Sequence, residues 1–134
     1  MEMAMEMPAA RNAPGARQTA WVSNGIRTEL VVIPYADRTF VIVTQLKKLG
    51  TLVMATSDAA GGMMGGSRGR RYSVQVLLGR RDDPLLSLYA RQMLEQMKSE
   101  KPLLLAICLK EEGRDTQTFQ EVINQVLTLG GWTG

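Results

Sequence analysis

The sequence contains few residues that could carry out covalent chemistry. Its 134 residues include no histidine and a single cysteine, Cys108, which lies within the apolar run LLLAICL. A serine or cysteine nucleophile ordinarily needs a neighbouring base, most often an imidazole, so the usual catalytic arrangements are absent. A lone thiol in an apolar strand is better explained by packing, and an unpaired cysteine is typical of the cytosol or the nucleus. We therefore expect no enzymatic activity.

Two adjacent carboxylates are the next candidates for chemistry. Asp82 and Asp83 stand directly before Pro84. Neighbouring side chains at a helix start diverge instead of meeting at one atom, which disfavours paired acid–base or metal chemistry. Aspartate followed by proline is instead a common helix start, with the aspartate as N-cap and the proline at the first helical position. We expect Asp83 to cap a helix.

Glycines and methionines could in principle bind a phosphate or a soft metal ion. Gly61 and Gly66 have the spacing of a phosphate-binding loop, but Ser67 stands where that motif needs a lysine. Several methionines could offer thioethers to Cu(I), yet no cysteine or histidine accompanies them. They are Met1, Met3, Met5, Met7, Met63 and Met64. We therefore expect no nucleotide, no metal and no other cofactor.

Basic side chains are the strongest polar feature. The net charge is +3, arginines flank the stretch YSVQVLLG on both sides, and two lysines begin the turn KKLG. These cations could bind nucleic acid, but no aromatic residue is interleaved for stacking on bases. An acidic protein surface fits them equally well, and simple solvation is the remaining explanation. The residues are Lys47, Lys48, Arg68, Arg70, Arg71, Arg80 and Arg81.

The chain is long enough for one domain, and 45% hydrophobic residues can form one packed core. Residues 1–17 show no usable hydrophobic period, so we expect a disordered N-terminal tail. Residues 18–132 should form the domain, interrupted by the Gly/Arg-rich stretch 57–71, which we expect to be a flexible loop. No apolar run approaches the ~18 to 20 residues that span a bilayer, so we expect no membrane segment.

Alternating apolar residues and turn signals predict the strands. Asn24 and Gly25 separate QTAWVS from IRTELVVI, and this pair is a strong hairpin signal because both residues tolerate positive φ. A turn at 35–38 leads into TFVIVTQL, and KKLG joins that run to TLVMAT. We expect a four-stranded meander in which the third and fourth strands pair as a hairpin. YSVQVLLG and LLLAICL are predicted as the fifth and sixth strands.

Apolar stripes at helical spacing predict two helices. One follows Asp83 and runs to about Ser99; the other begins near Asp115, or a turn later at a Thr118–Glu121 capping box. The fold class is α+β, a single mostly antiparallel sheet of about six strands with two helices packed on one face. Because both faces of the predicted hairpin are apolar, we expect the other face to be used for dimerisation.

Three parts of the chain resemble one known family. VIVTQLKKLGTLV resembles that family's hairpin, with Thr44, Gln45 and Lys48 in matching places. VLLGRRDDPLLSLYARQM resembles its strand-to-helix turn, and LLLAICLKEE with FQEVINQVL resembles its closing strand and helix. In the order and spacing of these parts, residues 18–129 are similar to the proteasome assembly chaperone 3 family. The Met-rich tail, the Gly-rich insert and the end GGWTG depart from it.

The resemblance implies a non-catalytic chaperone that promotes assembly of the 20S proteasome core particle by binding alpha-type subunits during alpha-ring formation. It implies a dimer that forms sheet to sheet, with a related sister chaperone or with a second copy of the chain, in the cytoplasm or the nucleus. Two alternatives stay open: a small basic nucleic-acid-binding module, and a homodimeric scaffold for other complexes. Only the identity of its binding partners would distinguish such a scaffold from the chaperone.

The pairing of the predicted hairpin indicates which residues would form each contact surface. The face expected to form the dimer interface carries Val41, Val43, Gln45, Leu52, Met54, Gln75 and Leu77. The two glutamines would add partner choice, because a buried unpaired amide costs ~1 to 3 kcal/mol. All seven basic residues named above, in the turn, the loop and beside the fifth strand, are expected to contact proteasome subunits.

Overall fold

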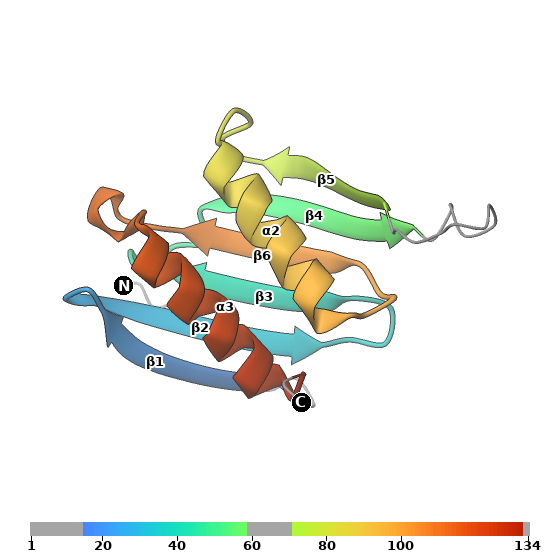
Figure 1. Cartoon of the computed structure of the whole chain (residues 1–134), viewed down its shortest axis with the longest axis horizontal. Coiled ribbons are helices and arrows are strands. Elements are labelled where there is room, and N and C mark those ends of the chain that lie inside the picture. The colour runs from blue at the N-terminus through green and yellow to red at the C-terminus, as the bar shows by residue number, and fades with distance from the viewer. Residues whose placement is uncertain (1–14, 59–70, 133–134) are drawn as a thin grey trace.

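The computed structural model describes residues 15–58 and 71–132, which form a six-stranded sheet with two helices on one face (Figure 1). The strands are β1 (Arg17–Ser23), β2 (Ile26–Pro34), β3 (Thr39–Thr44), β4 (Thr51–Asp58), β5 (Arg71–Leu78) and β6 (Leu103–Cys108). The helices are α2 (Pro84–Met97), α3 (Thr116–Gly130) and the short 3₁₀ helix η3 (Glu111–Gly113). This confirms the predicted α+β class.

Several sequence predictions fall on residues outside these ranges. Most of the tail predicted at 1–17, residues 59–70 of the loop, the phosphate-like spacing and the methionines proposed as thioether ligands all lie outside the described residues. The ends of the predicted loop do not: Ser57 and Asp58 belong to β4, and Arg71 begins β5. Strand pairing therefore extends further toward the glycine-rich stretch than the sequence indicated.

The first part of the chain pairs as predicted. β1 and β2 form an antiparallel hairpin in which Asn24 and Gly25 have φ of 55° and 82°, as a two-residue turn of this kind requires. β2 then pairs antiparallel with β3 across the turn at 35–38. Both connections are short, and the residues that determine them lie inside the turns.

The predicted hairpin between the third and fourth strands is wrong. The sheet order is β1-β2-β3-β6-β4-β5, so β6 lies between β3 and β4. β6 runs parallel to β3 and antiparallel to β4, while the other neighbouring pairs are antiparallel. The physical reason is burial: the strand LLLAIC is apolar at every position, and such a strand is most stable in the middle of a sheet with both faces covered.

The main core lies between the sheet and the helices. α2 packs over β4, β5 and β6, and α3 packs over β1 and β2 (Figure 1). The buried residues of α2 repeat at the helical spacing of its predicted apolar stripe, and they are Leu86, Tyr89, Ala90, Met93, Leu94 and Met97. Those of α3 are Thr118, Val122, Ile123, Val126 and Leu127. The residues buried from the sheet side include Leu30, Val41, Val43, Val53, Leu103 and Leu105.

Both helices begin where the sequence predicted. Asp83 is the N-cap of α2, with Pro84 as the first helical residue, and the Asp83 carboxylate accepts a hydrogen bond from the Leu85 N–H. Asp115 caps α3 by accepting from the Thr118 N–H, so the alternative start at a Thr118–Glu121 capping box is wrong. These caps satisfy backbone N–H groups that have no partner within the helix.

Candidate protein-binding surfaces

The seven residues predicted for the dimer interface do not share one face. Val41 and Val43 are fully buried under the helices, in the same core as Val53 and Ala55. They cannot meet another chain while the protein is folded. The error follows from the wrong hairpin, because side chains were assigned to faces by pairing β3 directly with β4, whereas both strands pair with β6.

The opposite side of the sheet, here called the helix-free face, carries no helix among the described residues (Figure 1). The strand register aligns Phe40 of β3 with Leu104 of β6, Leu104 with Met54 of β4, and Met54 with Gln75 of β5. Directly paired residues point to the same face of a sheet. Phe40, Leu104 and Met54 are partly exposed, and Gln75 is exposed. The result is a row of accessible side chains across four strands.

Leu52 and Leu77 extend this row toward the end of β5. Leu52 is partly exposed and pairs with Leu78, while Leu77 lies at the irregularity in the β4–β5 register and is 40% exposed. We call Phe40, Leu52, Met54, Gln75, Leu77 and Leu104 the accessible band. Four of its members were predicted from the sequence. Phe40 and Leu104 were missed, and the apolar pattern of β6, which indicates a central strand, is the signal that could have placed Leu104.

Part of the helix-free face beside this band is less accessible. Val31, Ile33, Ile42 and Ala106 form a second cluster there and are only 0% to 5% exposed. Ala16, Phe40 and Leu52 pack against this cluster. The helix-free face is therefore accessible on both sides of this cluster: along the band, and over β1, where Val22, which pairs with Arg27 of β2, is 66% exposed.

Gln45 has an internal role that the sequence did not predict. It is only 7% exposed, its amide nitrogen donates to the Thr28 hydroxyl at 3.0 Å, and its amide oxygen accepts from the Lys110 N–H, also at 3.0 Å. Its backbone N–H donates to the Cys108 carbonyl at 2.8 Å. Gln45 thus joins β2, β3 and the chain that leaves β6, and its amide is already paired. Of the two glutamines predicted to select a partner, Gln75 alone remains available.

The predicted basic residues lie in two separate places. Lys47 and Lys48 are in the β3–β4 turn, and Arg80 and Arg81 are in the turn that leads from β5 to α2. The second turn contacts the strand residue that follows the first, because the Arg80 N–H donates to the Thr51 hydroxyl at the start of β4 at 3.3 Å. Arg71 lies at the other end of β5. At ~3.3 Å per residue of strand, it is about 23 Å from Leu78, the last residue of that strand. Arg68 and Arg70 lie outside the described residues.

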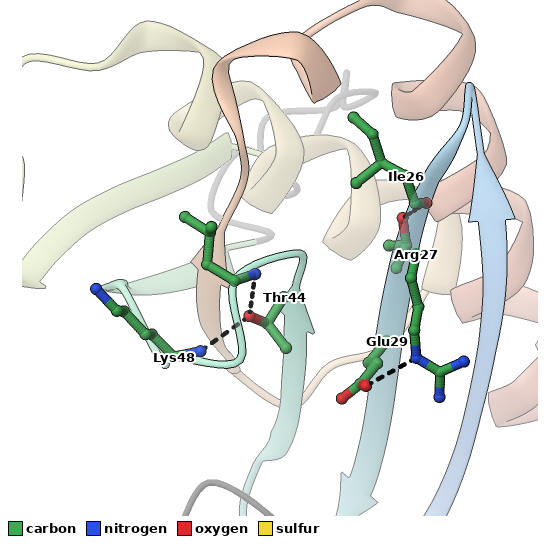
Figure 2. A network of polar contacts seen from close by, with 7 residues as sticks. Ile26, Arg27, Glu29, Thr44 and Lys48 are labelled. Atoms are coloured by element: carbon green, nitrogen blue, oxygen red, sulfur yellow. Dashed lines mark hydrogen bonds and ion pairs between the residues drawn. The ribbon is translucent and has the colours of Figure 1, made fainter. Parts of the chain in front are cut away.

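A hydroxyl at the end of β3 fixes the β3–β4 turn. The Thr44 side-chain oxygen accepts the N–H groups of Leu46 and Lys48, each at 3.1 Å (Figure 2). Lys47 between them has a φ of 58°, which non-glycine residues adopt only rarely. Threonine side chains often stabilise turns in this way. The turn therefore presents its side chains from a defined backbone.

The carboxylate of Asp83 is paired with a residue distant in sequence. Its Oδ1 accepts from Arg114 Nη2 at 2.6 Å as well as from the Leu85 N–H, and its side chain is only 4% exposed. Burial by itself raises the pKa of Asp83, but the hydrogen bond and charge of Arg114 and the Leu85 N–H outweigh it, so the pKa lies below its usual range. The Asp83–Arg114 pair joins the start of α2 to the segment before α3, so its role is structural.

Arg114→Met is expected to lower the free energy of unfolding by about 2 kcal/mol at neutral pH, because it leaves a buried carboxylate without its counter-charge. A depressed folded-state pKa contributes stability above the unfolded value near ~3.9, and that contribution is lost as pH falls through the folded value. The gap between wild type and variant should therefore be largest above about pH 5 and shrink below about pH 4. Urea unfolding across this range measures it.

Arg27→Met is the matched control, since Arg27 contacts Glu29 at 3.2 Å with 65% of its side chain exposed. An exposed pair of this kind contributes less than about 1 kcal/mol. Equal losses in the two variants, or an Arg114→Met gap that is the same at low and neutral pH, would contradict the role assigned to the buried pair.

Other candidates for chemistry are not grouped into a site. Cys108 is partly buried, and burial raises the pKa of its thiol, which disfavours the reactive thiolate form. Within the two described ranges, no three His, Cys, Asp or Glu side chains gather as possible metal ligands. No helix in these ranges is both long and apolar enough to cross a membrane.

A solved structure shares this fold. One chain in the crystal structure of a chaperone complex for yeast 20S proteasome assembly has a TM-score of 0.69 with this chain at 11% sequence identity. The match covers 86% of this chain and 98% of the other. At this identity the likeness shows the fold alone. The class that it defines is a small α+β domain with two helices on one face of a mixed sheet.

Sequence comparison identifies the family. The sequence model of proteasome assembly chaperone 3 matches residues 41–128. Proteasome assembly chaperone 3 of Nematostella vectensis is 35% identical over 105 residues, covering 72% of this chain and 76% of that protein. Those of Bos taurus and Homo sapiens are 30% and 27% identical over 117 residues, each covering 81% of this chain and 88% of theirs. The chain belongs to the proteasome assembly chaperone 3 family.

Family membership confirms two predictions from the sequence. The resemblance noted from the strand, turn and helix segments is correct, and it extends over more than half of the chain. Members of the family are non-catalytic assembly chaperones, which agrees with the prediction that the chain is not an enzyme.

Proposed function

We propose that this chain promotes assembly of the 20S proteasome core particle by binding alpha-type subunits while the alpha ring forms, as a dimer with a related chaperone. Family membership and the shared fold support a part in proteasome assembly. The observation that carries the dimer is the accessible band, an apolar row on a sheet face that a monomer would leave in contact with water. The chain would act in the cytoplasm or the nucleus.

The accessible band has the composition of an interface centre. Phe40, Leu104 and Met54 supply large apolar side chains, and Gln75 supplies one amide that can discriminate between partners. A sheet-to-sheet contact would bury the ~1,200 to 2,000 Å² of a standard interface. A related chain with a similar sheet is the partner that fits best, and a second copy of this chain is the other possibility to test.

Affinity purification of the tagged protein from its own cells, followed by mass spectrometry, tests the proposal. We expect alpha-type proteasome subunits and one small related chaperone, without the full set of beta-type subunits. Recovery of the complete core particle would indicate a stable component instead of an assembly factor. Ribonucleoproteins in place of proteasome subunits would instead favour the nucleic-acid-binding alternative, whose affinity should fall steeply with salt.

A further inference from the structure

We propose that the β3–β4 turn is a second binding site, which borders one end of the dimerisation face, and that it takes a protein segment in which carboxylates surround a large apolar side chain. The site consists of Leu46, Lys47, Lys48 and Leu49 together with Arg80 and Arg81, and we call it the basic tip. The inference rests on the proposed function in one respect, because an alpha-type subunit would be the source of that segment.

Two large apolar side chains at the tip, both leucines, are exposed. Leu46 is 42% exposed and Leu49 is 48% exposed, in a turn whose remaining side chains are also exposed. Turns are normally made of small and polar residues, because their side chains face water. Leu78, 66% exposed, lies beside the neighbouring turn. Apolar area gathered where it does not serve folding is typical of a binding surface.

The tip is held in place by contacts to buried residues. The two hydrogen bonds to the Thr44 hydroxyl fix the backbone at Leu46 and Lys48 (Figure 2). The next residue along from Thr44 is Gln45, whose amide is paired inside the protein. Lys47 stays at a φ of 58° within this framework. Strained backbone that surrounding contacts maintain is found most often at binding and catalytic sites.

The charge of the tip selects the partner. The six residues include four cations and no carboxylate. The carboxylates near this end of the sheet include Glu29, which is aligned with Thr44 and contacts Arg27, and also Asp82, Glu111 and Glu112, of which Glu111 lies 3.9 Å from Arg114. A segment with several carboxylates would therefore be attracted to the tip, while a basic segment would be repelled. The leucines add contact area for an apolar side chain at the centre of that segment.

Two other classes of partner fit less well. A nucleic acid would match the charge, but leucines offer no aromatic surface for base stacking. An anionic membrane would match both leucines and cations, yet the tip adjoins the accessible band through the Leu52–Leu78 pair, which continues the surface as a protein interface would. Both classes are tested below.

The experiment is an NMR titration of the isotope-labelled full chain with three short peptides of equal length. One combines glutamates with leucine and phenylalanine, the second replaces its apolar residues by serine, and the third replaces its glutamates by lysine. We expect amide shifts confined to the tip and saturable binding for the first peptide only. K47E/K48E should weaken that binding by at least about tenfold, since two close charges then repel the peptide.

Arg71→Glu is the matched control, because it reverses a charge at the far end of β5. Equal weakening by Arg71→Glu, shifts spread over the helix-free face, or equal binding of all three peptides would overturn the proposal. So would tighter binding to single-stranded RNA or to vesicles containing phosphatidylserine. Peptide binding at the tip by a protein that recovers no alpha-type subunit from cells would refute the proposed function and leave the tip intact as an acidic-segment site.

Discussion

Met54→Glu is expected to abolish dimerisation while leaving the chain folded. Met54 lies near the middle of the accessible band, between Leu104 and Gln75, and its side chain is only partly buried. A carboxylate there would lose its water in the dimer without gaining a partner, which commonly weakens an interface by about 100-fold or more. Size-exclusion chromatography with light scattering, on the protein alone and with its co-purified partner, measures the change.

Leu88→Glu is the control for Met54→Glu. Leu88 is 46% exposed on α2, on the other side of the sheet, so the same new charge there should leave dimerisation unchanged. If both variants dimerise like the wild type, the helix-free face is not the interface. A substitution at Val43 would be uninformative, because that residue is fully buried under the helices and a charge there would unfold the protein.

The features that could be predicted from the sequence are those that local residues determine. The Asn24–Gly25 turn needs positive φ at two positions, and few other pairs supply it. The start of α2 depends on an aspartate and the proline that follows it, and the stripe of α2 repeats within a single helix. Each of these signals lies within a few residues, so the order and type of the elements follow without knowledge of the tertiary structure.

The position of β6 could not be predicted in the same way. β6 follows β3 by more than fifty residues of chain, and its parallel pairing requires α2 as the crossover connection. No residue in the turn after β3 indicates that another strand lies between β3 and β4. The error carried over to the candidate site, because the facing of Leu52 and Met54 relative to Val41 and Val43 depends on that strand.

Polar contacts between segments far apart in the sequence could not be predicted either. From the sequence, Gln45 was predicted to present its amide on the surface of a strand. In the structure that amide is already hydrogen-bonded to the Thr28 hydroxyl and to the Lys110 N–H. Asp83 was correctly predicted as a cap, whereas nothing marked Arg114 as its partner 31 residues later. The sequence therefore identified the surface chemistry available to the protein but not which groups folding would use.

Gly50→Ala is expected to be among the most destabilising single changes in the protein, and the reason is the position of β6. Since β6 lies between β3 and β4, the connection that joins them must cross the end of β6. Gly50 is where the backbones meet: a Cβ there would lie 2.3 Å from the Ile107 carbonyl oxygen and 2.9 Å from the Cys108 Cα. The φ of 68° adds strain for any other residue. Together these effects should cost about 4 kcal/mol.

Gly25→Ala separates the two contributions to that cost. Gly25 has a φ of 82°, similar to that of Gly50, but a Cβ there would have no atom within 4 Å. The strain alone should cost about 1 kcal/mol, so urea unfolding should show a loss several times larger for Gly50→Ala. Equal losses would mean that the crossing can relax and that β6 does not confine the turn. A large difference would show that the strand inserted between β3 and β4 fixes the backbone from which the basic tip projects.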